Sequence, residues 1–404
     1  MKSINFKKLF FAYLTFLFLV AVYYLYGKHT GGLDSTISEW LINYQGGFTR
    51  RGLPGEIFFY ISNLFEIEIR FSIFIFQIII YFCFLCLVFY FFKDLKINFF
   101  YILVIFSPIF LLYHVAELEI LARKELLVFI QYLFFLILLG NKNFSKFKYV
   151  YIFFTLPLIA LSWEPVIFFI FFYIFLLLIT EQNQKFSKKY KKILLALIPF
   201  SLTILAILFN NYDALDEKKM CDALMVTFGE HCYMSLRYLD TTVGQNFYSL
   251  IKDVKASHII RYLLILIIGF APLFILIYYS SYNKIFKSLN IFRNKSLFII
   301  YLFIISPVLI LFLMGLDWGR WVNILYFFSL STFFFLIQNK IYIIYFKKLE
   351  EIRINLRLKN RFVSILVILL FCFGWNPKTL FKGDVASFPG YRVPYKLIKY
   401  ISTQ

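Results

Sequence analysis

The sequence is short of charged residues, histidine and cysteine for its length. Charged side chains make up 16% of the 404 residues, well below the proportion of about a quarter that is typical of soluble proteins. The four histidines and five cysteines show no spacing that resembles a metal-ligand set. These shortages argue against a soluble domain and against a metal centre, and we expect no cofactor.

Hydrophobic residues, in contrast, make up 61% of the chain. Apolar runs long enough to cross about 30 Å of hydrocarbon recur along its whole length. We expect an all-α, polytopic membrane protein with one transmembrane domain, 1–404, and eleven spans near 9–26, 69–92, 97–114, 126–140, 149–162, 166–180, 193–209, 262–280, 297–316, 322–339 and 362–375. The fifth and sixth runs are short, and a re-entrant pair is the alternative for them. No small-residue cleavage site follows the first run, so we expect a retained helix.

The net charge of +20 is explained by topology. With a cytoplasmic N-terminus, more than half of the 42 lysines and arginines fall in inside segments, at 2–8, 93–96, 142–148, 185–192, 284–295 and 340–361. This positive-inside pattern predicts an N-in, C-out orientation. We therefore expect no nucleic-acid partner.

The most informative segment is GGFTRRGLPGE, Gly46 to Glu56, in the predicted first outer loop, 27–68. Glycines surround Arg50 and Arg51, which predicts a shaped turn that carries two guanidinium groups. Such a turn at the outer headgroup layer suits a phosphate-bearing lipid partner. The alternative is that both arginines are solvated loop charges. The end of this loop, 57–65, is predicted to form a short interfacial helix.

Other unusual polar residues also fall in the predicted outer loops. They are Glu119 and Arg123 in HVAELEILARKE (114–125), Trp163 and Glu164 between the fifth and sixth runs, and Asp317, Trp318, Arg320 and Trp321 in LDWGRW. Charges so close to apolar spans are costly unless they are paired or serve a water-filled cavity. Two pairs, Glu119 with Arg123 and Asp317 with Arg320, have the spacing of intrahelical ion pairs. The tryptophans could instead form an interfacial aromatic belt.

Three further features leave alternatives open. Cys221 and Cys232 in the long outer loop, 210–257, are either free thiols or a disulfide in an oxidising compartment. Ser107-Pro108 and Ser306-Pro307 predict bends in the third and ninth runs. The last predicted outer segment is the tail, 376–404.

Together, the outer residues suit sugar transfer from a polyprenyl phosphate or diphosphate. Guanidinium groups stabilise the departing phosphate, a carboxylate takes the proton of the attacking hydroxyl, and aromatic faces stack on sugar rings. The candidate catalytic acids are Glu164, Glu119 and Asp317, the phosphate-binding residues are Arg50, Arg51, Arg123 and Arg320, and the sugar-binding residues are Trp163, Trp318 and Trp321.

On GGFTRRGLPGE, ELEILARKE and LDWGRW, and on its overall architecture, the chain resembles the O-antigen and capsular repeat-unit polymerases of bacteria. That resemblance implies polymerisation of undecaprenyl-diphosphate-linked oligosaccharides at the periplasmic face of the inner membrane, beside a flippase or a chain-length regulator. In the commoner pattern of that group the arginines lie in two later outer loops.

The first-loop placement of the arginine turn also makes the chain similar to GT-C glycosyltransferases, in which an acidic residue of the first outer loop, followed by interfacial helices, serves the active site. That likeness implies single-sugar transfer with Asp34 or Glu39 as the base. A transporter of lipid-linked saccharides is the alternative of another class. Its signature would be ionisable residues near the middle of the bilayer, whereas the charges here gather at one interface.

Overall fold

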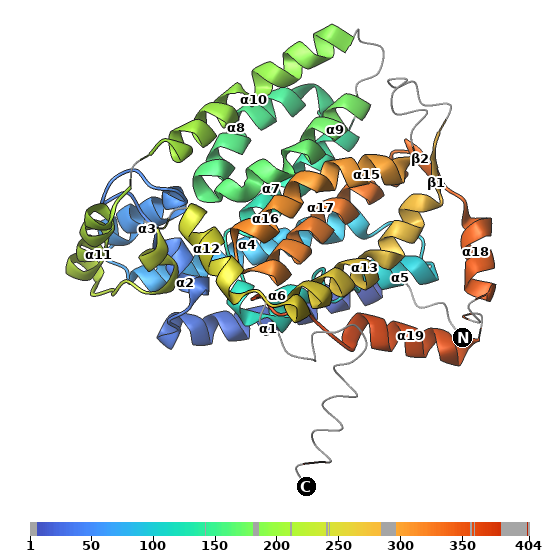
Figure 1. Ribbon diagram of the computed structural model, residues 1–404, viewed down its shortest axis with the longest axis horizontal. Helices are drawn as coiled ribbons and strands as arrows, with labels where there is room; N and C mark the ends of the chain where they lie inside the picture. The colour runs from blue at the N-terminus through green and yellow to red at the C-terminus, as the bar shows by residue number, and fades with distance from the viewer. Residues whose placement is uncertain are drawn as a thin grey trace. The chain divides into compact units, whose positions relative to one another are not determined.

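The computed structural model describes residues 6–141, 143–180, 186–210, 212–239, 241, 243–283, 296–355, 358, 360–380 and 402 (Figure 1). Within these residues nearly all regular structure is helical, which confirms the predicted all-α class. The chain divides into two compact units. The first comprises Met1–Leu95, Leu118–Ile170 and Ser187–Gln245, and the second comprises Lys96–Glu117, Phe171–Phe186 and Asn246–Gln404.

The first unit contains long apolar helices and several short ones between them. Its helices are α1 (Phe6–Gly31), α2 (Ser35–Leu41), α3 (Gly52–Leu64), α4 (Ile69–Phe92), η1 (Leu118–Ile120), α7 (Glu125–Gly140), η2 (Ser145–Phe147), α8 (Lys148–Ser162), η3 (Glu164–Phe169), α10 (Phe186–Leu208), α11 (Ala214–Phe228) and η4 (Met234–Tyr238). Helix α4 packs against α1 and α7, while α3 packs against α2, α4 and α8. Helix α3 is therefore held both by its sequence neighbours α2 and α4 and by α8, which comes from a distant part of the chain.

The second unit is built around α17 (Trp318–Gln338), which is buried along almost its whole length. The other elements assigned to this unit, with two that begin just before its boundaries, are α5 (Phe99–Ile105), α6 (Tyr113–Ala116), α9 (Ile170–Thr180), α12 (Val243–Asp253), α13 (Ala256–Tyr278), β1 (Ser280–Tyr282), α15 (Leu297–Ile305), η5 (Ser306–Ile310), α16 (Leu311–Met314), β2 (Tyr342–Ile344), α18 (Phe346–Asn355) and α19 (Arg361–Phe373). Strands β1 and β2 pair antiparallel, with Ser281 opposite Ile343. Helix α13 packs on α5, α15 and α17.

Six helices among the described residues are long and apolar enough to cross a membrane. They are Phe6–Gly31, Ile69–Phe92, Tyr190–Leu208, Ala256–Tyr278, Leu297–Met314 and Trp318–Gln338. Shorter apolar helices cover Glu125–Gly140, Glu164–Thr180 and Arg361–Phe373. These lengths and compositions fit a multi-pass membrane protein, and the count of eleven crossings and their orientation stay predictions.

At both Ser-Pro pairs, where the sequence predicts a bend, the α-helix is interrupted. Helix α5 ends at Ile105, just before Ser107-Pro108, and the α-helix of the ninth run changes to the 3₁₀ segment η5 at Ser306. Proline has no N–H to continue the hydrogen-bond ladder, so nearby carbonyl groups lose their helical partners. In the second unit, the Tyr326 hydroxyl donates to the carbonyl oxygen of Val104, four residues before Pro108, at 2.9 Å. Asn323 donates to the carbonyl oxygen of Ile109 at 2.9 Å. Side chains of α17 thus satisfy the backbone at the break.

The described start of the C-terminal tail is folded into the second unit. Glu117 accepts hydrogen bonds from the Asn376 side chain (2.9 Å), the Lys378 ammonium (2.9 Å) and the Thr379 backbone (3.3 Å). The backbone N–H of Gly319 donates to the Thr379 carbonyl group (3.1 Å). The rest of the predicted tail, apart from residue 402, lies outside the described residues.

Candidate functional site

Five charged side chains form a cluster in the first unit: Glu39, Arg51, Arg123, Lys124 and Glu164. Glu39 lies on α2, Arg51 precedes α3, Arg123 and Lys124 precede α7, and Glu164 begins η3. Four separate segments of the chain therefore contribute to the cluster.

The inner part of the cluster is a buried ion pair between Arg123 and Glu39. The Arg123 guanidinium donates from both Nε and Nη2 to the two carboxylate oxygens of Glu39, and the Nε–Oε2 distance is 2.9 Å. Their side chains are 6% and 0% exposed. Desolvated charges of this kind persist only with close, hydrogen-bonded partners. The pair therefore joins α2 firmly to the segment before α7.

The outer part of the cluster is a second fork, between Arg51 and Glu164. Arg51 Nε lies 2.8 Å from Glu164 Oε2, and Arg51 Nη2 lies 2.7 Å from Oε1. These side chains are 21% and 19% exposed. Arg51 Nη1 is also 3.6 Å from Glu39 Oε1, so Arg51 interacts with the carboxylates of both ion pairs.

The backbone at Arg51 adopts a left-handed conformation, with φ of 64°. This conformation is costly for a residue with a Cβ atom and needs support from its surroundings. The Lys124 ammonium supplies that support by donating to the Arg51 carbonyl oxygen at 2.5 Å. Ala122 is left-handed as well, with φ of 51°, and its carbonyl oxygen accepts from Trp40 Nε1 at 3.0 Å. Both strained residues are therefore held by buried polar side chains.

The glycines of GGFTRRGLPGE allow close packing of the backbone. A Cβ atom added to Gly55 would lie 1.9 Å from the carbonyl oxygen of Ile42, and one added to Gly46 would lie 2.0 Å from that of Asp216. The predicted turn exists, but it ends at Arg51, because Gly52 to Glu56 already form the first turn of α3. Glu56 accepts from the backbone N–H of Tyr44 at 2.7 Å. The turn is thus fixed by contacts on both sides.

The electrostatics of the cluster differ between Lys124 and Arg51. Burial lowers the pKa of Lys124 from 10.5 to about 7, because Glu39 and Glu164 only partly offset the cost of desolvation and the nearby Arg51 and Arg123 add to it. Burial would also lower the pKa of Arg51, but Glu164 and Glu39 outweigh it and the net shift is upward. The Arg51 guanidinium is charged at any relevant pH, whereas Lys124 titrates near neutrality.

The lowered pKa of Lys124 predicts that the protein becomes more stable as the pH rises from about 7 to 9. In this window the unfolded chain, with a lysine pKa near 10.4, binds more protons at this site than the folded protein. The free energy of unfolding should therefore rise by up to about 1.4 kcal/mol per pH unit from this residue. Unfolding of the purified protein in detergent at several pH values measures the slope. Lys124→Met should flatten it, and an equal slope in the variant would refute the assignment.

The structure brings three of the predicted site residues in the first unit together: Arg51, Arg123 and Glu164. The alternative ion pair between Glu119 and Arg123 is wrong. The Glu119 side chain is exposed, and Arg123 contacts only its carbonyl oxygen, at 3.5 Å. Arg50 precedes Arg51 and is partly exposed.

The sequence-based prediction did not include Lys124 among the site residues, and it gave Glu39 a role only under the glycosyltransferase alternative. Its position could have indicated a role, because Lys124 follows Arg123 directly and lies at the very start of an apolar run. Asp34, the other acid of that alternative, caps α2 by accepting from the Thr36 backbone N–H at 2.9 Å and forms an ion pair with Lys28. Asp34 thus contributes to the start of α2.

Trp163 also belongs to the first unit, where it is fully buried between α8 and η3. A fully buried indole cannot lie in an aromatic belt at the protein surface, so this interpretation is wrong for Trp163. Its ring packs against Phe169, with a centroid separation of 6.2 Å.

The remaining predicted site residues belong to the second unit. Asp317 and Arg320 form an ion pair at 3.0 Å, which confirms that alternative. Trp318 and Trp321 are 7% and 6% exposed, so neither lies in a surface belt. The Trp318 ring contacts Tyr262 edge-on at 5.3 Å. Arg320 lies 5.5 Å from the Trp321 ring centroid. These rings are committed to internal packing.

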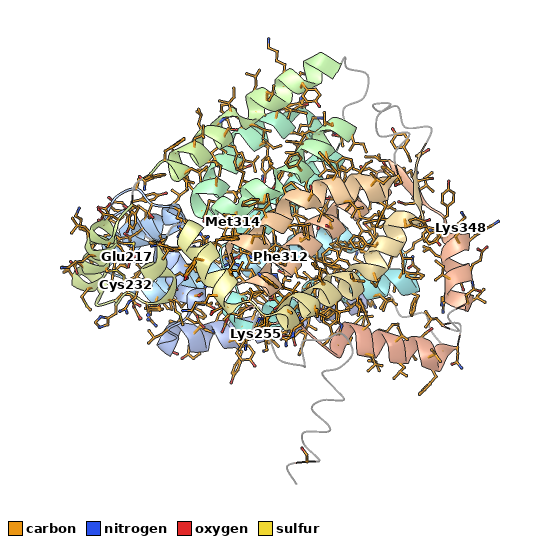
Figure 2. The ribbon with its side chains drawn as sticks, viewed as in Figure 1. Glu217, Cys232, Lys255, Phe312, Met314 and Lys348 are labelled. Atoms are coloured by element: carbon orange, nitrogen blue, oxygen red, sulfur yellow. A yellow bond between two sulfur atoms is a disulfide. The ribbon has the colours of Figure 1, made fainter. Side chains whose placement is uncertain are left out.

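The long loop forms a small structure on the first unit. Cys221 and Cys232 are disulfide-bonded, which settles the two alternatives in favour of the bridge. Arg70 on α4 forms a fork with Glu230, with both N–O distances at 2.7 Å. Figure 2 labels Glu217 and Cys232 in this region. The Ser235 backbone N–H also donates to Ser38 Oγ on α2 at 3.2 Å, so the loop is fastened to both α4 and α2.

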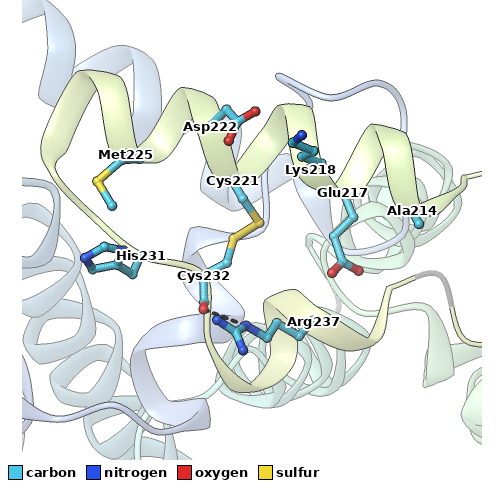
Figure 3. A pocket seen from close by; sticks show the side chains of 9 residues that line it. All are labelled: Ala214, Glu217, Lys218, Cys221, Asp222, Met225, His231, Cys232 and Arg237. Carbon is cyan, nitrogen blue, oxygen red and sulfur yellow. Dashed lines mark hydrogen bonds between the residues drawn. A yellow bond between two sulfur atoms is a disulfide. The ribbon is translucent and has the colours of Figure 1, made fainter.

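An open hollow of about 510 Å³ lies beside the disulfide (Figure 3). Its charged lining residues are Glu217, Lys218, Asp222 and Arg237. Arg237 donates to the Cys232 carbonyl oxygen at 2.9 Å. Among the described residues, no group of three His, Cys, Asp or Glu side chains could hold a metal ion.

Comparison with known proteins finds no family model, no curated protein and no solved structure that matches this chain.

Proposed function

We propose that this protein transfers saccharides from a polyprenyl phosphate or diphosphate carrier at the extracytoplasmic face of a bacterial inner membrane. The observation that carries the proposal is the Arg51–Glu164 fork, a partly exposed guanidinium paired with a carboxylate in a helical chain with candidate membrane spans. A guanidinium fork matches the oxygens of phosphate, and a carboxylate beside it can accept a proton. One small cluster thus holds both groups that the reaction needs.

In the proposed reaction, Glu164 takes the proton of the acceptor hydroxyl. The acceptor oxygen forms a bond with the anomeric carbon of the donor while the bond from that carbon to the phosphate oxygen breaks. The bonding electrons leave with the phosphate, and Arg51 stabilises the negative charge that develops there. The buried Arg123–Glu39 pair and Lys124 hold Arg51 in position.

The proposed topology has eleven crossings with the N-terminus inside. It places the turn before α3, the start of η3 and the long loop on the outer side. The Cys221–Cys232 disulfide supports this side for the long loop, because disulfides persist in oxidising compartments such as the periplasm. Asn210 donates to the Phe48 carbonyl oxygen at 2.5 Å, so the long loop and the arginine turn adjoin each other.

Within this reaction class we propose polymerisation of undecaprenyl-diphosphate-linked repeat units of O-antigen or capsule. The single-sugar alternative needs a first-loop acid as the base. Glu39 is held by the Arg123 fork, and Asp34 caps α2 and pairs with Lys28. Glu164 is also held by an arginine fork, but its side chain is 19% exposed whereas that of Glu39 is 0% exposed, and this difference supports Glu164 as the base. A flippase or a chain-length regulator is the proposed protein partner.

Arg51→Ala and Glu164→Gln in the native host test the proposal. We expect long polysaccharide chains to be lost from a gel of surface polysaccharide, while a single capped repeat is retained. Loss of one sugar from every repeat would instead support single-sugar transfer. Glu68→Gln is the matched control, because Glu68 is an exposed acid of the same predicted outer loop, and it should leave the pattern unchanged. Unchanged polysaccharide in well-expressed Arg51 and Glu164 variants would refute the proposal.

A further inference from the structure

The two ion pairs of the cluster differ in their access to solvent. Arg123 and Glu39 are 6% and 0% exposed, whereas Arg51 and Glu164 are 21% and 19% exposed. A ligand from outside can reach the second pair but not the first. Breaking the inner pair would also leave a buried charge without compensation, which is strongly unfavourable. Only the Arg51–Glu164 pair is therefore suited to open and close.

The donors that Arg51 offers to Glu164 are the donors that a phosphate would use. Nε and Nη2 lie 2.8 Å and 2.7 Å from the two carboxylate oxygens, in the two-point arrangement that guanidinium forms with carboxylate and phosphate alike. In the structure, the protein's own carboxylate thus occupies the position of the anion.

We propose that the Glu164 carboxylate occupies the phosphate-binding position on Arg51 until the donor binds. The donor phosphate then displaces Glu164 from Arg51, and the released carboxylate acts as the base. This inference rests on the proposed function and adds an order of events to it. Arg51 changes its partner from carboxylate to phosphate before the chemical step begins.

The surroundings favour movement of Glu164 rather than of Arg51. The Arg51 backbone is held by the Lys124 hydrogen bond and by the start of α3, and its Nη1 stays 3.6 Å from Glu39. Glu164 begins the short 3₁₀ helix η3, and its carboxylate is connected to the inner pair through the shared Arg51. Rotation about its side-chain bonds is enough to open the fork.

The exchange also changes the chemistry of Glu164. A carboxylate held by guanidinium is a weak base, because the cation favours the ionised form. When the phosphate takes the guanidinium, the released carboxylate has lost that cation and lies near a new negative charge. Both changes increase its affinity for a proton. Donor binding therefore prepares the base that removes the proton from the acceptor hydroxyl.

Binding of farnesyl phosphate to the purified full-length protein in detergent, measured by calorimetry, tests the exchange. Glu164→Gln removes the internal competitor, so we expect about tenfold tighter binding than in the wild type. Arg51→Gln should abolish binding, and the exposed control Glu68→Gln should match the wild type. Inorganic phosphate and farnesol, in separate titrations, distinguish recognition of a lipid phosphate from recognition of a free anion or of the chain alone.

Tighter binding by Glu164→Gln could also follow simply from removing a negative charge near the phosphate. Proton uptake on binding distinguishes this effect from displacement of Glu164 by the phosphate. Calorimetry at pH 6 in buffers of different ionisation enthalpy should show more proton uptake on binding in the wild type than in Glu164→Gln. Glu164→Asp, which keeps the charge on a shorter side chain, serves if the glutamine variant does not fold, and its affinity should be intermediate.

Equal affinity and equal proton uptake in wild type and Glu164→Gln would overturn the exchange and leave the proposed function standing. Wild-type binding by a folded Arg51→Gln variant would overturn the phosphate site itself, and with it the proposed function. Tight binding of inorganic phosphate together with no preference for farnesyl phosphate would contradict a lipid-linked donor.

Discussion

Replacing Glu39 with glutamine is expected to lower the free energy of unfolding by about 3–5 kcal/mol, the range found when one partner of a buried ion pair is removed. Glu39 is fully buried, and both of its carboxylate oxygens accept from Arg123. The variant leaves the Arg123 guanidinium, itself 6% exposed, without its counter-charge. Arg51 Nη1, 3.6 Å from Glu39, loses a favourable interaction as well.

Thermal or chemical unfolding of the purified variant in detergent measures this effect. Glu68→Gln, the same change at an exposed position, should shift stability by less than about 0.5 kcal/mol. The double variant Glu39→Leu with Arg123→Met removes both charges, so it should recover much of the loss. If the double variant is as unstable as the single one, burial of an unpaired charge is not the cause.

The second large effect is expected from Gly55→Ala. The added Cβ atom would lie 1.9 Å from the Ile42 carbonyl oxygen and 2.7 Å from that of Trp40. Both neighbours are backbone atoms at the end of α2, so no flexible side chain can move aside. Inserting a methyl group into a packed site typically costs about 1–3 kcal/mol, and we expect the upper end here.

This substitution should also impair the proposed saccharide transfer, because α3 begins next to Arg51 and a displaced first turn moves the guanidinium. Gly27→Ala on α1 is the matched control, since nothing lies within 4 Å of its added Cβ atom. Alanine is favoured over glycine inside a helix by about 0.5–1 kcal/mol, so the control should be neutral or slightly stabilising. Equal behaviour of the two variants in unfolding and in polysaccharide assays would contradict the close approach of α2 and α3.

The bounds of most long apolar helices were predictable from the apolar runs of the sequence to within a few residues. The second run, 69–92, has the same bounds as α4, and the fourth run differs from α7 by one residue. Hydropathy and backbone hydrogen bonding act within a segment, so its length is decided locally. The helix break beside Ser107-Pro108 follows from the missing proline N–H, which is equally local.

The partners of the site charges were not predictable in this way. The ion pair between Asp317 and Arg320 forms at the spacing where a sequence-based expectation is strongest. Glu119 and Arg123 have a comparable spacing, yet Arg123 pairs with Glu39, 84 residues away. The reason is the irregular backbone around Ala122, which places Arg123 against α2 instead of beside Glu119.

The sequence by itself determined that the chain is helical and apolar, roughly where most of its long apolar helices lie, and which residue types could serve an anion. Only the tertiary structure decided that Arg51 meets Glu164 across 113 residues, and that Lys124 is buried behind them. Helix formation depends on interactions over a few residues. Ion pairing between distant segments depends on how α2, α3, α7 and α8 pack, and no local pattern in the chain encodes those distances.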